Sequence, residues 1–273
     1  MSTATRIDRT LKIHGTLVYL FLYAPILVVV IFAFNESRLV QIWQGFSTRW
    51  FAEAWADRSL RNALCISIVT ATLNAGLATV LGTSAAIALR NVGRRTRSTF
   101  DAFMYTTLIV PEIVIAIASL MFFVTIGLPL GPVAIIITHS VFNTSVVGLV
   151  VRARLAGLDR SLEEAATDLG ATRWATFYQV TLPQISPAVL AGALLAFTFS
   201  FDDVVLSSFV SGVGSTTLPV EIFSLIRLGV SPKVNVVAVA TLALTITAIV
   251  IAQILLRREA RPTRAGAPLS GEA

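Results

Sequence analysis

The sequence predicts an all-α integral membrane protein with six transmembrane helices. Of its 273 residues, 55% are hydrophobic and only 13% are charged, and the mean hydropathy is +0.80. A soluble domain carries about 25% charged residues. Long apolar segments alternate with short polar ones, and the basic residues are concentrated in every second polar segment. These three observations argue against a soluble fold.

Six segments are apolar enough to cross a bilayer, which takes about 20 residues of helix. We place these spans near residues 15–34, 63–89, 102–126, 132–151, 185–207 and 234–256. Four of the spans contain no Asp, Glu, Lys or Arg, whereas Glu112 interrupts the third and Asp202 and Asp203 interrupt the fifth. Residues 1–258 are therefore expected to form one transmembrane domain, followed by a disordered tail, 259–273.

The distribution of Lys and Arg predicts the orientation of the chain. With a cytoplasmic N-terminus, the inside segments are 1–14, 90–101, 152–184 and 257–273. These segments hold 15 of the 21 basic residues, which is the positive-inside pattern. We therefore expect both termini in the cytoplasm, and we attribute the basic excess to topology rather than to a nucleic-acid partner. The densest cluster, Arg90, Arg94, Arg95 and Arg97, is expected to be a topology anchor, with binding of anionic lipid as the alternative.

The first apolar run is about 20 residues long and has no Ala-x-Ala site after it, so we expect an uncleaved span rather than a signal peptide. The single cysteine, Cys65, lies within a span and excludes a disulfide or metal framework. No cofactor is expected, and the chain lacks a Gly-x-x-x-x-Gly-Lys-Ser/Thr loop for nucleotide phosphates. The second span carries small residues at helical spacing, which indicates close helix packing. They are Ala71, Ala75, Ala78, Gly82 and Ala86.

The polar segment 152–184 is predicted to contain two short helices joined by a sharp turn. Ser161 followed by Glu164 fits a capping box at the start of the first helix. Gly170 is placed to end that helix in the left-handed conformation, and Thr172 to cap the second helix.

The second helix of this segment is expected to stop before Leu182 and Pro183, because the residue before a proline disfavours the helical conformation. Residues 152–173 hold four acidic and four basic side chains. This balance favours docking of a partner protein over the alternative, an amphipathic helix lying on lipid.

The same segment resembles the EAA loop of permeases in binding-protein-dependent ABC importers, which reads Glu-Ala-Ala, three residues, Gly, nine residues, Ile-x-Leu-Pro. The matching residues are Glu164, Ala165, Ala166, Gly170, Leu182 and Pro183, and Val180 stands where Ile is usual. The resemblance implies a type I ABC importer permease fold with a cytoplasmic coupling helix. The residues that it assigns to ATPase coupling are Glu163, Glu164, Ala165, Ala166, Asp168, Leu169 and Gly170.

Further stretches look like the PotC-type permease subunits of spermidine/putrescine importers. They are 34–37, 43–46, 202–210, 218–224 and 229–235. This resemblance implies half of a polyamine path in a bacterial inner membrane, with no enzyme activity in this chain. The implied partners are two ATPase subunits, a second permease of PotB type and an extracytoplasmic binding protein, besides the surrounding lipid. Related permeases carry other amines, opines or phosphonates. A proton-coupled secondary transporter is a further alternative, which leaves the EAA-like loop unexplained.

Three carboxylates within the spans, Glu112, Asp202 and Asp203, are the candidate substrate-path residues. A charge at the bilayer centre costs at least about 2.5 kcal/mol, so such side chains face a bundle interior or a water-filled cavity. They either line a path for ammonium groups or serve structure, by capping a broken helix or pairing with another subunit. Asp202 and Asp203 point about 100° apart on a continuous helix, so we expect one of them to face the path. His139 is expected to make an interhelical hydrogen bond, with a proton relay as the alternative.

Overall fold

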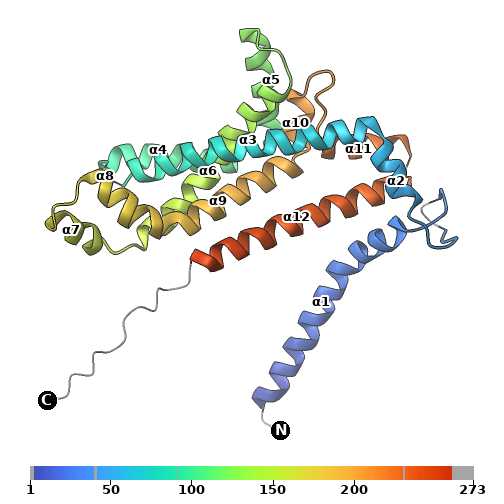
Figure 1. Cartoon of the computed structure of the whole chain (residues 1–273), viewed down its shortest axis with the longest axis horizontal. Coiled ribbons are helices and arrows are strands. Elements are labelled where there is room, and N and C mark those ends of the chain that lie inside the picture. Colours follow the sequence, from blue (N-terminus) through green and yellow to red (C-terminus); the bar gives the residue numbers. More distant parts are fainter. Residues whose placement is uncertain (1–2, 40–41, 91, 230, 260–273) are drawn as a thin grey trace.

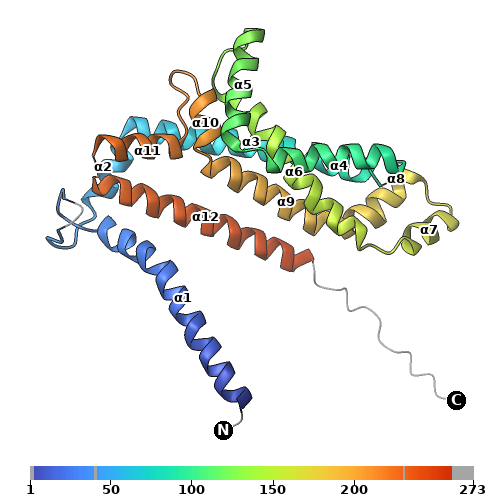
Figure 2. The same cartoon turned by 180° about the vertical axis from the view of Figure 1, so that it is seen from behind.

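The computed structural model describes residues 3–39, 42–90, 92–229 and 231–259. Its helices are α1 (Thr3–Ala33), α2 (Arg49–Ala56), α3 (Arg58–Ala88), α4 (Arg94–Ile109), α5 (Glu112–Ile126), α6 (Pro132–Ala156), α7 (Ser161–Asp168), α8 (Arg173–Thr176), the π-helical turn η1 (Phe177–Thr181), α9 (Leu182–Asp202), α10 (Val205–Val210), α11 (Leu218–Leu228) and α12 (Pro232–Glu259). The long helices α3, α6, α9 and α12 run side by side in an elongated body, and α1 extends away from it (Figure 1). The view from behind shows the same arrangement (Figure 2).

All six predicted spans fall on helices. Four helical stretches are long and apolar enough to cross a membrane, and the α4–α5 pair makes a fifth if it is counted as one broken span. Those four are Leu11–Ala33, Arg58–Ala88, Pro132–Ala156 and Arg173–Asp202. The sixth prediction falls on α12, of which Pro232–Thr247 is counted as a shorter apolar helix. The prediction of an all-helical, multi-pass membrane protein is confirmed. The predicted tail lies outside the described residues from position 260 onward.

The third span is not the continuous helix that we expected over 102–126. It is broken between α4 and α5, which are bent by 103° relative to each other. Val110 is extended, with ψ of 129°, directly before Pro111. A proline disfavours the helical conformation of the residue before it and has no N–H to donate, so the helix ends here. As a result α5 stands out from the body (Figure 1).

The fifth span, predicted over 185–207, is also broken. Helix α9 ends at Asp202, the backbone at Asp203 is extended with ψ of 128°, and α10 begins at Val205. Both breaks place carboxylates at helix ends rather than in the middle of a helix. The side chain of Asp203 caps the helix that follows the second break, as described below.

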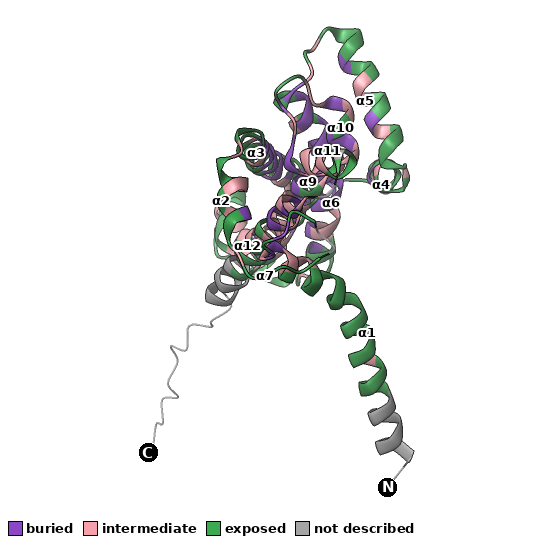
Figure 3. Cartoon of the chain, turned by 90° about the vertical axis from the view of Figure 1, so that its right-hand side faces the viewer, coloured by how far each residue is buried: buried purple, intermediate pink, exposed green. Residues whose placement is uncertain are grey.

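The core lies between α3, α6 and α9, where buried residues gather on the facing sides of the helices (Figure 3). Small residues allow this close approach, as their spacing predicted. A Cβ atom added at Gly82 of α3 would lie 2.7 Å from the carbonyl oxygen of Thr144 and 2.8 Å from the nitrogen of Gly148, both in α6. Polar side chains add interhelical bonds of the kind found in membrane bundles. The amide of Asn74 donates to the carbonyl of Ala196 at 3.2 Å.

Candidate functional site

Helix α7 and its turn lie at one end of the elongated body, at the opposite end from α2 and α11 (Figure 1). No side chain of α7 is buried. Beside it, Leu169 is 89% exposed and Trp174 is 71% exposed. Apolar side chains that are exposed at this end of the body are available for contact with a partner protein. Of the residues that the resemblance assigned to coupling, Glu164, Ala165, Asp168, Leu169 and Gly170 are exposed, and Glu163 and Ala166 are half-buried.

The turn after α7 has the predicted geometry. Gly170 has φ of +84°, in the left-handed region. The N–H of Ala171 donates to the carbonyl of Ala166 at 3.0 Å and the N–H of Gly170 to that of Thr167 at 2.9 Å, which is a Schellman motif. The hydroxyl of Thr172 accepts from the N–H of Ala175 at 3.3 Å and caps α8. Both local predictions, the glycine turn and the threonine cap, are confirmed.

Two other predictions for this segment are wrong. The capping box at Ser161 does not form, because Asp159 takes its place: its carboxylate accepts from the N–H of Ser161 at 2.9 Å. This hydrogen bond lowers the pKa of Asp159. The chain also stays helical through Pro183, because the π-helical turn Phe177–Thr181 precedes it and leaves the proline in the first turn of α9, where a missing N–H is tolerated.

The two adjacent glutamates of α7 have different surroundings. Glu163 points toward the body, where its Oε1 accepts from Arg90 at 2.5 Å and from the hydroxyl of Thr181 at 2.7 Å. Burial raises the pKa of Glu163, but the hydrogen bonds from Arg90 and Thr181 outweigh it, so that the pKa lies below its ordinary value. Glu164 is exposed and has no ion pair or side-chain hydrogen bond within the described part of the chain. Glu163 therefore fixes α7 to the body, while Glu164 is open to a partner.

The link between Glu163 and Arg90 predicts a pH-dependent contribution to stability. Because the folded-state pKa of Glu163 is depressed, the stabilisation is present above its unfolded-state pKa and is lost as the pH falls through the folded-state value. Glu163→Gln is expected to cost about 1.5–3 kcal/mol at neutral pH, the usual range for a hydrogen bond to a charged group. Thermal unfolding of wild type and variant across pH measures this difference, which should shrink in acid. Glu164→Gln is the matched control and should change stability by less than about 0.5 kcal/mol; an equal effect of both substitutions would refute the anchoring role.

The three intramembrane acids lie around one cavity of about 430 Å³. Glu112 is the first residue of α5, and Asp202 and Asp203 stand at the end of α9. His139 and Asn143 of α6 line the same space. The two helix breaks thus bring together carboxylates that are 90 residues apart in the chain. Among the described residues, no group of three or more His, Cys, Asp or Glu has the arrangement to hold a metal ion.

The carboxylate of Asp203 contacts the backbone of α10 and the ring of His139. It accepts from the backbone N–H groups of Leu206, at 3.2 Å, and Ser207, at 2.7 Å, and so caps α10. Its Oδ2 also lies 3.2 Å from Nε2 of His139. The other ring nitrogen of His139 lies 2.7 Å from the hydroxyl of Ser200. The interhelical hydrogen bond predicted for His139 is therefore present. Asp203 has the structural role considered above, because it caps the helix that follows a break.

Asp202 and Glu112 differ from Asp203 in being exposed. Asp202 also lines a second cavity of about 380 Å³ between α9, α11 and α12. Neither Asp202 nor Glu112 makes a side-chain hydrogen bond or ion pair within the described part of the chain. Of the three acids, these two are available to a ligand in the cavity.

Comparisons with known proteins agree with this architecture. The family model for "Binding-protein-dependent transport system inner membrane component" matches residues 78–261. The chain is 46% identical to the putrescine transport system permease protein PotI of Escherichia coli K12, over 85% of this chain and 84% of that one. It is 37% identical to the spermidine/putrescine transport system permease protein PotC of the same strain, over 89% and 92%.

Two solved structures share the fold. One is a bacterial ABC transporter involved in the import of alginate, with a TM-score of 0.75 at 14% identity over 94% of this chain and 99% of that one. The other is the MetNI methionine ABC transporter, with a TM-score of 0.63 at 19% identity over 74% and 96%. The predicted type I importer permease fold is confirmed. The chain belongs to the family of binding-protein-dependent transport system inner membrane components, which are transport subunits rather than enzymes.

Proposed function

We propose that this chain is a permease subunit of an ATP-driven importer and forms half of a path for putrescine, spermidine or a related organic cation. The observation that carries the proposal is the cavity lined by Glu112, Asp202 and Asp203. Ammonium groups that leave water need opposite charge nearby, and carboxylates facing a cavity supply it. PotI and PotC, which match most of this chain, are named as permeases for putrescine and for spermidine/putrescine, which are organic cations of the same class. An acidic lining disfavours the binding of a phosphonate, because the carboxylates and the phosphonate are both negatively charged.

The residues have different roles within this proposal. Asp202 and Glu112 contact the substrate, since both are exposed and have no side-chain partner among the described residues. Asp203 holds the break between α9 and α10 and keeps the cavity in shape. It also contributes negative charge at close range. This division follows the expectation that one of the two adjacent aspartates faces the path.

Helix α7 is the proposed contact to the ATPase. Its exposed face carries Glu164, Ala165 and Asp168, and Leu169 follows directly. The Schellman turn at Gly170 and the Glu163–Arg90 link give this surface a fixed orientation relative to the spans. A movement of the ATPase pair is therefore passed on to α3 and α9, which rocks the bundle between outward and inward access.

The remaining partners and the orientation follow the same proposal. A second permease, of PotB type, completes the path, two ATPase subunits hydrolyse ATP, and an extracytoplasmic binding protein delivers the substrate. The chain lies in a bacterial inner membrane with both termini in the cytoplasm, as the distribution of its basic residues indicates. Residues 1–258 act as one permease domain, with 152–184 as its coupling loop.

One observation favours a second candidate, a proton-coupled transporter. His139 and Asp203 form a buried titratable pair beside the cavity, and such pairs serve as proton relays in secondary transporters. ATP dependence separates the two candidates. Uptake into vesicles that needs ATP and persists without a proton gradient supports the importer, and uptake driven by a proton gradient alone supports the second candidate.

Cysteine crosslinking tests the docking surface. Single cysteines at Leu162, Glu164 and Leu169 are expected to crosslink to cysteines on the ATPase in native membranes, because these side chains are exposed around α7. Cysteines at Arg94 and Arg95, which are also exposed and lie on α4, serve as the control. Crosslinks that form only from the α4 positions would place the ATPase contact elsewhere and contradict the proposal.

A further inference from the structure

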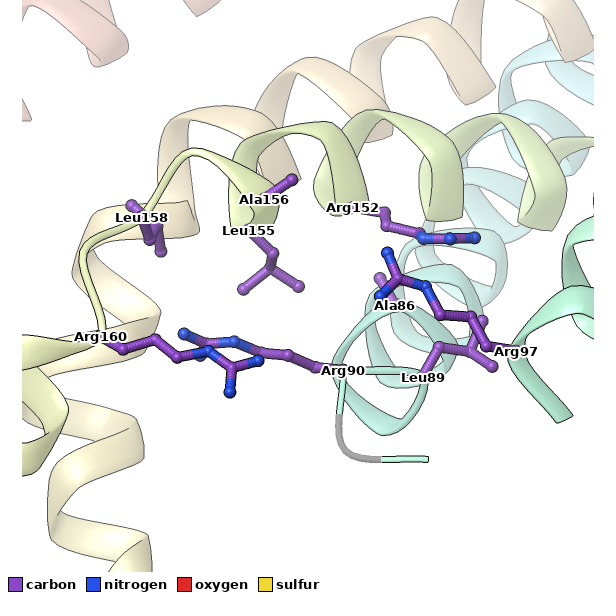
Figure 4. A pocket seen from close by; sticks show the side chains of 9 residues that line it. All are labelled: Ala86, Leu89, Arg90, Arg97, Arg152, Leu155, Ala156, Leu158 and Arg160. Atoms are coloured by element: carbon purple, nitrogen blue, oxygen red, sulfur yellow. The ribbon is translucent and has the colours of Figure 1, made fainter. Parts of the chain in front are cut away.

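A pocket of about 270 Å³ lies beside the coupling loop, between the ends of α3 and α6, the first half of α4 and the residue before α7 (Figure 4). Four arginines line it: Arg90, Arg97, Arg152 and Arg160. The rest of the wall is apolar, and consists of Ala86, Leu89, Leu155, Ala156 and Leu158. The pocket is thus both strongly basic and amphipathic.

The positive charge in this pocket is only partly neutralised. Arg90 pairs with Glu163, and Nη2 of Arg152 donates to Asp101 at 2.7 Å. Arg97 and Arg160 have no carboxylate within ion-pair distance among the described residues. Arginine stays protonated at all physiological pH values, so a surplus of two positive charges remains.

Figure 4 shows how these side chains gather around the pocket. Arg97 lies near Arg152 and is close enough to interact with it electrostatically. Arg90 and Arg160 extend toward each other, and both act on the carboxylate of Glu163. Like charges held this close repel one another, and a bound anion between them removes the repulsion.

The chemistry of the lining selects the anion. A guanidinium group matches phosphate through paired N–H donors, and the leucines beside the arginines suit a group attached to hydrocarbon. The pocket lies where two candidate spans end, α3 at Ala88 and α6 at Ala156, so we expect it at the level of the bilayer surface. Basic pockets between transmembrane helices at this depth are of the kind that holds anionic head groups. Its volume is at the lower edge of small-molecule sites, about 300 Å³, and favours one head group over a protein segment.

From these observations we propose that the pocket binds the phosphate head group of an anionic phospholipid. The bound lipid stabilises the coupling loop, since Arg90 both lines the pocket and holds Glu163, and Arg160 directly precedes α7. The proposal is independent of the transported substrate and requires only that the chain lies in a membrane.

Native mass spectrometry of the full chain in neutral detergent, titrated with phosphatidylglycerol, measures the binding. Wild type is expected to retain one tightly held lipid. In the double variant Arg97→Ala/Arg160→Ala its affinity should fall on the order of tenfold or more, because the two arginines without a carboxylate partner no longer attract the phosphate. Both substitutions leave the two ion pairs of the pocket intact. Arg94→Ala/Arg95→Ala is the matched control, since it removes the same charge nearby from residues that do not line the pocket, and it should bind lipid as wild type does.

Three outcomes would overturn the proposal. An equal loss of lipid in both double variants would mean that surface charge alone attracts it. Inorganic phosphate is added at millimolar concentration as a competitor. If it displaces the lipid and binds with the same affinity as the lipid, the pocket is a site for free phosphate. Loss of the lipid from wild type when the ATPase subunits are bound would assign the pocket to an acidic segment of that partner.

Discussion

Asp202→Asn and Glu112→Gln are each expected to lower polyamine uptake by about 10- to 100-fold, while assembly with the ATPase is retained. Losing one partner of a desolvated charge pair commonly costs about 2–5 kcal/mol, and a hydrated cavity brings the effect toward the lower end. Both side chains are exposed to the cavity and have no partner in the described chain, so each amide removes charge without removing an internal contact. Uptake assays beside pull-down of the ATPase from the same membranes measure both quantities.

Asp203→Asn is expected to behave differently from these two variants. Its carboxylate caps α10 and faces His139, so the amide should reduce the amount of assembled protein as well as transport. Glu53→Gln, at a half-buried acid of α2 that pairs with Arg49 and does not line the cavity, is the control and should transport normally. Full uptake by both Asp202→Asn and Glu112→Gln would exclude a cation path through this cavity.

Gly170→Val should weaken ATPase association and reduce uptake by about tenfold or more without affecting membrane insertion. The glycine has φ of +84°, a conformation that costs an L-residue roughly 1–2 kcal/mol and a β-branched residue more. Every 1.4 kcal/mol corresponds to about tenfold in an equilibrium. A Cβ atom at this position has no neighbour within 4 Å, so the cost comes from the backbone conformation and not from a clash.

Gly170→Asn separates the conformational argument from a loss of loop surface. Asn tolerates the left-handed conformation better than other residues with a side chain, so this variant should retain most of the activity. Pull-down and uptake are measured for both variants at matched protein levels. Equal impairment by Asn and Val, or wild-type uptake by the Val variant, would remove the argument for a tight turn.

Features that depend on neighbouring residues could be predicted from the sequence. The lengths of the apolar segments located all six helical regions, and Gly170 and Thr172 identified the turn between α7 and α8. The break at Pro111 has an equally local cause, but its angle of 103° depends on how α5 packs and could not be predicted.

Contacts between residues far apart in the chain could not be predicted from one sequence. Glu163 and Glu164 look equivalent in the chain, and only the position of Arg90, 73 residues away, separates the anchoring glutamate from the exposed one. In the same way, the role of Asp203 depends on its contacts with the N–H groups of α10 and with His139 of α6, 64 residues away in the chain. The apolar surroundings of the three acids did indicate that they face a bundle interior or a water-filled cavity, and the structure places all three around one cavity.

The most direct test of the proposed function is uptake by a strain or proteoliposome that contains the whole transporter. Labelled putrescine is supplied with an excess of unlabelled spermidine, an unrelated monoamine, an opine or a phosphonate. We expect ATP-dependent putrescine uptake that requires this chain and is reduced by spermidine but not by the phosphonate. ATP-dependent uptake that is reduced by the opine or the phosphonate and unaffected by spermidine would contradict it.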